Sequence, residues 1–179
     1  MPRILTLGHS SRSFDDFVRL LRAERIATLI DVRRYAGSKR HPQFTKRSLV
    51  DALLFEGVGY FHEPALGGMR RALDDSPNDA LAEPFRGYAD HMSTPEFAAA
   101  LERVASLARR ELVALMCAEA NPERCHRRYL ADAFVLAGFE VRHVLEPNRS
   151  LPHERHPRLV RDAAGRPVYR KSGQLSLFR

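Results

Sequence analysis

The chain has 179 residues, of which 44% are hydrophobic and 28% are charged. This composition is ordinary for a soluble globular protein, and the length allows one domain with an ample core. No run is long and apolar enough to span a membrane and no signal-peptide pattern opens the chain, so we expect no membrane partner. The two cysteines argue against a disulfide scaffold and for a reducing compartment, which predicts a bacterial-type cytoplasmic protein.

The net charge of +7 is concentrated near the end of the chain. Residues 147–179 carry +6 and are rich in proline and arginine, whereas residues 1–146 are almost neutral. We therefore predict an α/β domain over residues 1–146 and a largely flexible basic arm over residues 147–179. Within the arm, residues 158–171 have a turn signal at Ala164-Gly165 that is compatible with a hairpin.

Apolar runs and helix signals alternate along residues 1–146. Strands are expected at residues 4–8, 27–32, 58–61, 111–116 and 140–145. Helices are expected after the capping residue Ser13, over residues 46–56, from Thr94 onward, and from Pro122 to the C-cap Gly138. The alternation predicts a three-layer α/β fold with a mostly parallel sheet of about five strands and helices on both faces.

Residues 115–127 form the most informative segment, because they hold both cysteines together with charged and imidazole groups. They follow a predicted strand and open a predicted helix, which places a polar loop beside a helix N-terminus. Such a loop binds anions, and its positive potential lowers the pKa of a thiol. We therefore expect Cys117 to be a reactive thiol.

Residues that end other strands are expected to lie near Cys117. In open parallel sheets, ligands bind outside the carboxyl ends of the strands, so loops from separate strands converge there. The candidate catalytic residues at this edge are Cys117, His9, Asp31 and Glu119. Taken singly, a hydrogen-bonded loop histidine is the simpler explanation of His9, and a cap or a partner of Arg33 is the simpler explanation of Asp31.

Basic residues at the same edge predict a phosphate-bearing ligand. Residues 33–47 contain six positive charges and no acid, with Tyr35 and Phe44 interleaved, as in surfaces that bind nucleic acid. A solvated basic loop is the equally weighted alternative. The candidate ligand- or phosphate-binding residues are Ser10, Arg33, Ser38, Arg40, Arg70, Arg124, His126 and Arg127.

Three kinds of chemistry fit the cysteine segment. A phosphatase-like or rhodanese-like thiolate would use Cys117 with Arg124 or Arg127, but six residues separate Cys117 from Arg124, one more than in the usual phosphatase loop. A structural Cys117, with His126 and Arg127 binding a phosphate without chemistry, is equally supported. A metal site of Cys117, Cys125 and His126, with His9 as a further ligand, is less favoured, because the usual close pairing of cysteines is absent. These residues identify no particular cofactor, and they are compatible both with an enzyme and with a binding protein.

A set of short motifs resembles the DUF488 family. The motifs lie at residues 6–10, 30–33, 38–44, 66–70, 85–89, 116–119 and 125–127. The resemblance covers about residues 4–145 and implies an α/β domain, without an assigned biochemical activity. One departure lies in the basic loop, where the family usually has a proline near Ala36 and Ser-Arg in place of Ser38-Lys39.

A second motif, Gln174-Leu175-Ser176-Leu177-Phe178, stands near the end of the sequence. It is similar to the pentapeptide by which bacterial polymerases and repair proteins bind the sliding clamp. Leu177 and Phe178 would fill an apolar pocket, while Leu175 supports them and Gln174 makes polar contacts at the rim. The alternative is a terminal strand that packs its apolar side chains on the chain's own domain.

Two function classes follow from these observations. The first is a DNA-maintenance protein of repair or replication, which the sliding clamp brings to DNA and which acts on a nucleotide or phosphate beside Cys117. The second is a non-catalytic nucleic-acid or nucleotide-binding module with the same recruitment. A metal-dependent enzyme with cysteine and histidine ligands is a further alternative.

Overall fold

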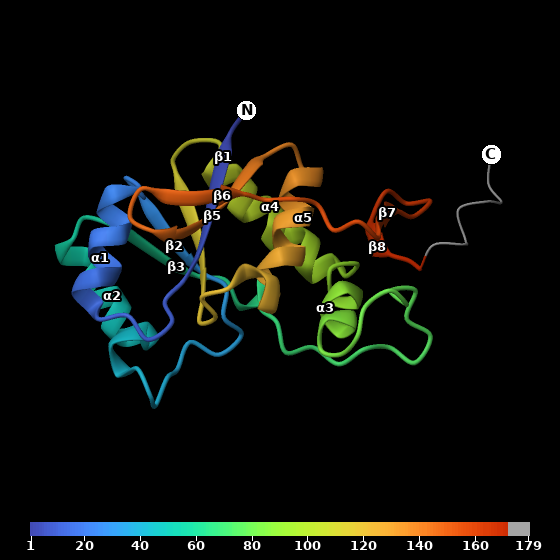
Figure 1. Ribbon diagram of the computed structural model, residues 1–179, viewed down its shortest axis with the longest axis horizontal. Helices are drawn as coiled ribbons and strands as arrows, with labels where there is room; N and C mark the ends of the chain where they lie inside the picture. Colours follow the sequence, from blue (N-terminus) through green and yellow to red (C-terminus); the bar gives the residue numbers. More distant parts are fainter. Residues whose placement is uncertain (172–179) are drawn as a thin grey trace.

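The computed structural model describes residues 1–171 of the chain (Figure 1). One sheet contains the strands β1 (Arg3–Gly8), β2 (Thr28–Asp31), β3 (Gly59–His62), β4 (Val113–Cys117), β5 (Glu140–Glu146) and β6 (Arg149–Pro152). The α-helices are α1 (Phe14–Ala23), α2 (Lys46–Phe55), α3 (Phe85–His91), α4 (Pro95–Ala108) and α5 (Arg127–Leu136). Short 3-10 helices lie at Pro42–Phe44, Pro64–Leu66 and Pro122–Arg124. Within these described residues, no helix combines the length and the apolar character needed to cross a membrane.

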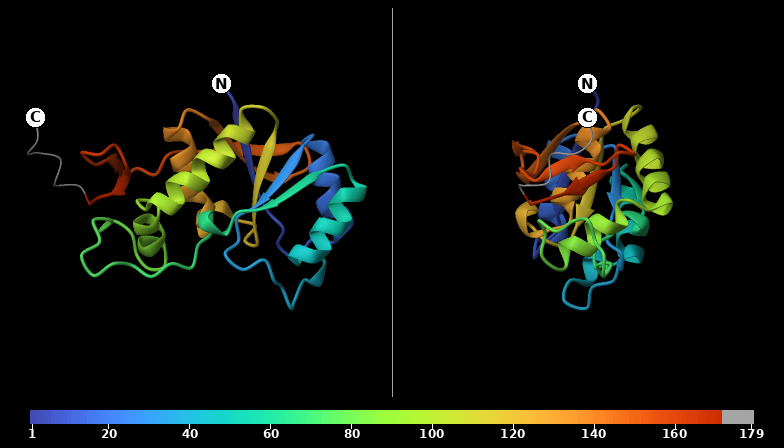
Figure 2. Two further views of the ribbon diagram at one scale, coloured as in Figure 1. Left: turned by 180° about the vertical axis from the view of Figure 1, so that it is seen from behind. Right: turned by 90° about the vertical axis from the view of Figure 1, so that its right-hand side faces the viewer.

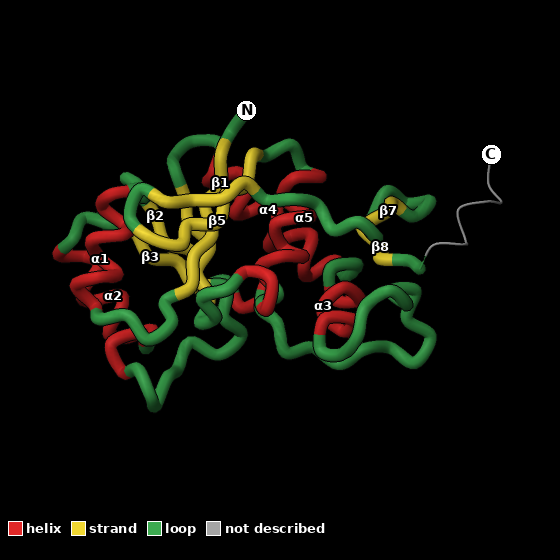
Figure 3. The backbone as a smooth tube through the Cα atoms, viewed as in Figure 1, coloured by secondary structure: helices red, strands yellow, loops and turns green. Residues whose placement is uncertain are grey.

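The sheet has the strand order β3-β2-β4-β1-β5-β6. The first five of these strands run parallel, and β6 pairs antiparallel with β5 at one edge. Figure 3 shows the strands in yellow between helices in red. The prediction of a mostly parallel α/β sheet is therefore confirmed, with one strand more than the five expected from residues 4–145.

Two hydrophobic cores lie on opposite faces of the sheet, which confirms the three-layer prediction (Figure 2). On one face, Phe17 of α1 and Leu49 of α2 pack with Leu29 of β2. On the other face, the core contains Val104 of α4 and Phe134 of α5, together with further residues of α3 and of the strands. The central strands β1, β2 and β4 are thus covered on both faces, as their largely apolar sequences require, whereas the edge strand β3 is partly exposed.

Side-chain caps begin three of the helices. The hydroxyl groups of Ser13, Thr45 and Thr94 accept hydrogen bonds from backbone N–H groups in the first turns of α1, α2 and α4. The predicted starts at Ser13 and Thr94 are confirmed. The predicted start at Pro122 is wrong for α5, because Cys125 is extended (φ −128°, ψ 148°) and separates the 3-10 helix Pro122–Arg124 from the α-helix that begins at Arg127.

Residues 147–171 are more regular than the sequence indicated. The expectation of a flexible arm directly after residue 146 is wrong, since residues 149–152 add β6 to the sheet. The strands β7 (Leu159–Arg161) and β8 (Pro167–Tyr169) then form the antiparallel hairpin that the turn signal at Ala164-Gly165 indicated. The hairpin is anchored on the domain, because Tyr169 is fully buried and its hydroxyl donates to Asp132 at 2.8 Å. The pentapeptide at residues 174–178 lies outside the described residues.

Candidate functional site

The strand order creates a switch point between β1 and β4. These strands are neighbours, yet the chain leaves β1 for α1 on one face of the sheet and leaves β4 for α5 on the other face. A crevice at the carboxyl ends of such strands is the usual ligand site of an open α/β sheet. The loops that follow β1 and β4 carry the predicted site residues, so the topology brings them to this crevice.

The two loops at the switch point are held together by backbone contacts. The N–H groups of His9 and Ser10 donate to the carbonyl oxygens of Cys117 and Ala118, both at 2.9 Å. Gly8 permits this approach, because a Cβ atom at that position would lie 2.0 Å from the carbonyl oxygen of Glu119. The close packing fixes the separation between the histidine loop and the cysteine loop.

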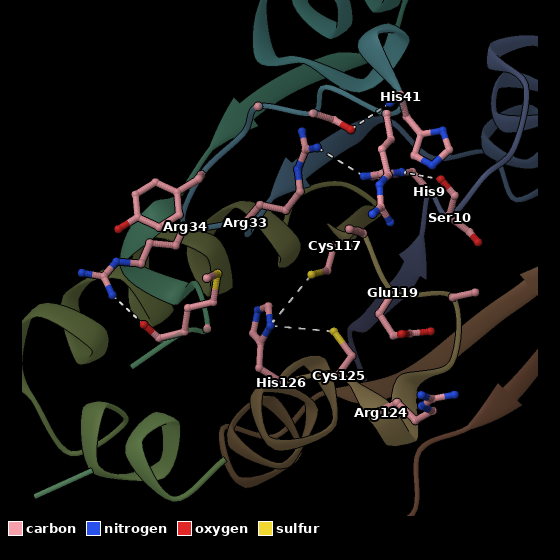
Figure 4. Close-up of a pocket in the computed structure, with 18 of the residues that line it drawn as sticks. His9, Ser10, Arg33, Arg34, His41, Cys117, Glu119, Arg124, Cys125 and His126 are labelled. Carbon is pink, nitrogen blue, oxygen red and sulfur yellow. Dashed lines mark hydrogen bonds between the residues drawn. The ribbon is translucent and has the colours of Figure 1, made fainter. Parts of the chain in front are cut away.

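A cavity of about 890 Å³ opens at this crevice (Figure 4). Its walls come from the segments after β1, β2, β3 and β4 and from α3. The predicted site residues among its lining are His9, Ser10, Arg33, Ser38, Arg40, Cys117, Glu119, Arg124, Cys125 and His126. The structure therefore brings most of the predicted residues together, whereas Asp31, Arg70 and Arg127 do not line the cavity.

Asp31 and Arg33 form a buried ion pair beneath the cavity. The Arg33 guanidinium donates to the Asp31 carboxylate at 2.8 and 2.6 Å, and the hydroxyl of Tyr60 donates to it at 2.7 Å. Arg33 is only 6% exposed and also donates to the carbonyl oxygen of Phe44. The oxygens of Asp31 are occupied and hold Arg33 in place, which is the simpler explanation that the sequence offered for this residue.

His9 is held neutral beside Arg33. Burial is the main cause that lowers the pKa of His9 to about 4, and the nearby Arg33 charge acts in the same direction. Its ring stacks on Phe44 with centroids 4.3 Å apart, its Nδ1 lies 2.9 Å from the Ser10 carbonyl oxygen, and its Nε2 lies 3.2 Å from Arg33 Nη1. The neutral tautomer with a proton on Nδ1 satisfies both contacts, so His9 is positioned as a fixed, uncharged wall of the cavity.

Cationic side chains surround the cavity. Arg34, Lys39, Arg40 and Arg124 line it, and none of them forms an ion pair within the described part of the chain. Many arginines elsewhere contact carboxylates. The rim is therefore an area of positive potential that is available to an anionic ligand. We call these four residues the cationic rim.

An exposed aromatic ring lies beside the cationic rim. Tyr35 is 64% exposed, and the guanidinium of Arg34 lies 5.5 Å from its ring centroid. Arg34 also donates to the carbonyl oxygen of Met69 at 2.6 Å, which fixes the arginine toward the residue 66–70 segment. An accessible ring next to unpaired cations provides a surface on which a base can stack.

The two cysteines and His126 form a compact cluster at the cavity wall. The Nδ1 atom of His126 lies 3.9 Å from Cys117 Sγ and 3.7 Å from Cys125 Sγ. The hydrogen bond to Cys125 and burial raise the pKa of Cys117, whereas the hydrogen bond from Cys117 lowers the pKa of Cys125. The prediction of a lowered pKa at Cys117 is therefore wrong, because the neighbouring thiol is the better stabilised thiolate.

Arg127 supports the cluster from beneath the cavity. It is 1% exposed and donates from Nε to Cys125 Sγ at 3.4 Å and from Nη1 to Thr6 Oγ1 at 3.2 Å. It also donates to the carbonyl oxygens of Glu119 and Ala120. Every donor nitrogen of this guanidinium thus has a protein partner, and Arg127 does not line the cavity.

Three other predicted residues have well-defined partners. Arg70 donates to the carbonyl oxygens of Gly67 and Pro64, so it stabilises its own segment outside the cavity. Ser38 lines the cavity and its hydroxyl oxygen accepts from the His41 backbone N–H at 3.0 Å. The Glu119 carboxylate accepts from the Asn121 backbone N–H at 3.0 Å and is the one acidic side chain of the lining among the described residues.

Several residues of the cavity lining were not predicted from the sequence. Arg34, Lys39 and His41 belong to the basic loop. Its composition indicated a ligand-binding surface but did not show which of its residues line the cavity. Phe85 and Tyr88 come from α3, and the only signal for them was the family motif at residues 85–89. The apolar wall that these rings form could not be assigned from periodicity.

The fold and the cavity define an α/β protein with a basic pocket at the switch point of a parallel sheet. A family model, described as the domain of unknown function DUF488, matches residues 13–134. The chain therefore belongs to the DUF488 family, as its motifs indicated. No curated protein and no solved structure matches the chain.

Proposed function

We propose that this protein is a DNA-maintenance protein that binds a phosphate-bearing strand of nucleic acid at the switch-point cavity. The observation that carries the proposal is the cationic rim, four lining cations without an ion-pair partner among the described residues. Phosphate contacts supply most of the affinity of nucleic-acid binding, and they require cations that are not already neutralised. A cytoplasmic location belongs to the same proposal.

A single strand fits this surface better than a duplex. The exposed ring of Tyr35 offers a stacking platform, and stacking requires a base that is not paired inside a helix. The cavity of about 890 Å³ is large enough to receive a nucleotide beside the rim. The proposal concerns binding, and it assigns no turnover to the cavity.

The recruitment part of the proposal rests on the sequence motif at residues 174–178. We propose that this pentapeptide binds the bacterial sliding clamp, with Leu177 and Phe178 as its apolar anchors. The last described contact before it is a hydrogen bond from the Lys171 backbone N–H to Asp79 at 3.0 Å. Clamp binding would raise the local concentration of the protein, and so of its cavity, at DNA during repair or replication.

A salt titration tests the nucleic-acid part of the proposal. Binding of a fluorescently labelled single-stranded oligonucleotide is measured by anisotropy at several salt concentrations. The triple change of Arg34, Lys39 and Arg40 to Ala is expected to weaken binding and to lower the slope of log K against log salt by about 2, because each lost phosphate contact contributes about 0.7.

The matched control removes the same charge elsewhere. Arg3, Arg19 and Arg109 are partly exposed, pair with carboxylates and do not line the cavity. Their triple change to Ala is expected to leave the slope nearly unchanged. Equal losses of slope in the two triple variants would show that binding follows net charge alone, which contradicts a specific site at the cationic rim.

A further inference from the structure

We propose that Cys117, Cys125 and His126 bind a divalent transition metal ion, of which zinc suits their chemistry best. The two Sγ atoms and an imidazole nitrogen all lie within 4.8 Å of one another (Figure 4). Thiolate and imidazole are the preferred zinc ligands in proteins. The proposed metal centre goes beyond the proposed nucleic-acid binding and does not depend on it.

The distances in the cluster match a tetrahedral ion. Zinc lies about 2.3 Å from thiolate sulfur and about 2.0–2.1 Å from imidazole nitrogen, so a sulfur and a nitrogen ligand of one ion are about 3.6 Å apart. The observed separations from His126 Nδ1 are 3.9 Å to Cys117 Sγ and 3.7 Å to Cys125 Sγ. Shifts of a few tenths of an ångström would bring the His126 nitrogen and either sulfur to the separation of two ligands of one zinc ion.

Hydrogen bonding alone does not account for the position of His126. Its side chain lies more than nine-tenths buried, and the Nε2 atom has no hydrogen-bond partner in the described part of the chain. Its Nδ1 atom faces two sulfur atoms. One imidazole nitrogen, which carries either one proton or one lone pair, cannot form a strong hydrogen bond with both of them. A metal ion between Nδ1 and the two sulfur atoms would accept one lone pair from each of these three atoms.

A buried cation, Arg127, lies beneath the cluster. Arg127 is buried and has no carboxylate partner among the described residues, and its Nε–H group points at Cys125 Sγ at a distance of 3.4 Å. A buried guanidinium requires a negative partner, and a thiolate at Cys125 provides one. Hydrogen bonds to ligand atoms from such outer residues also orient the ligands of a metal site.

The proposed centre is open on one side. Three protein donors occupy three tetrahedral positions, and all three residues line the cavity, so the fourth position faces it. His9 is not the fourth ligand that the sequence suggested, because both of its ring nitrogens already have partners in Ser10 and Arg33. Sites with three protein ligands bind a water molecule or a ligand oxygen in the fourth position. A phosphate-bearing ligand in the cavity would therefore meet the ion.

Metal analysis of the full chain tests the proposal. The protein is stripped with a chelator under reducing conditions, dialysed against Zn²⁺ and analysed by mass spectrometry for bound metal. We expect about one zinc ion per chain, and with Co²⁺ the near-ultraviolet absorption of a thiolate–cobalt bond. Zinc should also protect Cys117, the more accessible of the two thiols, from iodoacetamide in the unaltered protein, and the chelator should restore its reaction.

Substitutions locate the ion. Cys117→Ser, Cys125→Ser and His126→Asn are each expected to weaken zinc affinity by more than about 100-fold, the upper range for changes in outer residues. The control His41→Asn alters another histidine of the cavity and should retain the metal. The proposal is overturned if the unaltered protein binds no zinc, or if the Cys117→Ser/Cys125→Ser double variant binds it as tightly. Oligonucleotide binding is measured separately on the metal-free protein, so failure of one proposal is distinguishable from failure of the other.

Discussion

Replacing Arg33 by Met is expected to destabilise the folded protein by about 3–5 kcal/mol. The change removes the hydrogen bonds at 2.8 and 2.6 Å to Asp31, whose carboxylate is fully buried. That carboxylate keeps the hydroxyl of Tyr60 at 2.7 Å and a backbone N–H at 3.2 Å, but it loses its only cationic partner among the described residues. The melting temperature should fall by roughly 10 °C for a chain of this length.

Urea denaturation followed by circular dichroism measures this loss. The control Arg19→Met breaks the exposed pair with Asp16, which should cost less than about 1 kcal/mol. The double variant Asp31→Leu/Arg33→Met should cost less than the sum of its single changes, because it leaves no buried charge. If Arg33→Met lowers the free energy of unfolding no more than Arg19→Met does, the view that the Asp31–Arg33 pair stabilises the structure beneath the cavity is refuted.

Three further predictions concern pH, packing and recruitment. Burial is the main cause that lowers the pKa of His143 to about 3 and that of His9 to about 4. Below pH 6.5 the unfolded chain therefore binds more protons than the folded protein. The free energy of unfolding should fall from pH 6.5 toward pH 4 by up to about 1.4 kcal/mol per pH unit for each histidine. In urea titrations at several pH values, His143→Asn should reduce the slope of the free energy of unfolding against pH by about one proton. Gly8→Ala should lower the melting temperature by many degrees in a thermal scan, since the new Cβ would meet a backbone oxygen at 2.0 Å; a change of only one or two degrees would contradict this close packing. A peptide of residues 168–179 should bind a bacterial sliding clamp with a Kd near 1 μM, about −8 kcal/mol, and Leu177→Ala/Phe178→Ala should abolish binding in calorimetry without changing the domain's melting temperature.

The parts of the fold that local patterns determine were predictable. Ser13 and Thr94 are side-chain caps followed by apolar residues at helical spacing, and both begin helices in the structure. The helix α3 was missed because it has seven residues and no side-chain cap at Pro84. The strand β6 was missed because it has four residues, of which two are polar and the last is proline, a composition that an edge strand tolerates.

The candidate site was predictable in position but not in the role of each residue. Strand ends locate the cavity, because parallel strands have their carboxyl ends at one edge. Burial of charged groups is a tertiary property, so the sequence offered Asp31 as a partner of Arg33 only as one alternative, and it could not show that Arg127 lies under Cys125. The same limit explains the error at Cys117, where the neighbouring thiol reverses the expected pKa shift.

Photocross-linking tests the central claim, nucleic-acid binding at the cationic rim, most directly. A single-stranded oligonucleotide with bromodeoxyuridine is irradiated with the full chain, and the linked peptides are identified by mass spectrometry. We predict links to the exposed ring of Tyr35 and to neighbouring residues of the cavity, because a stacked base would lie against that ring. Links confined to the exposed side chains of α1 and α2, with none at residues 33–41, would contradict the claim.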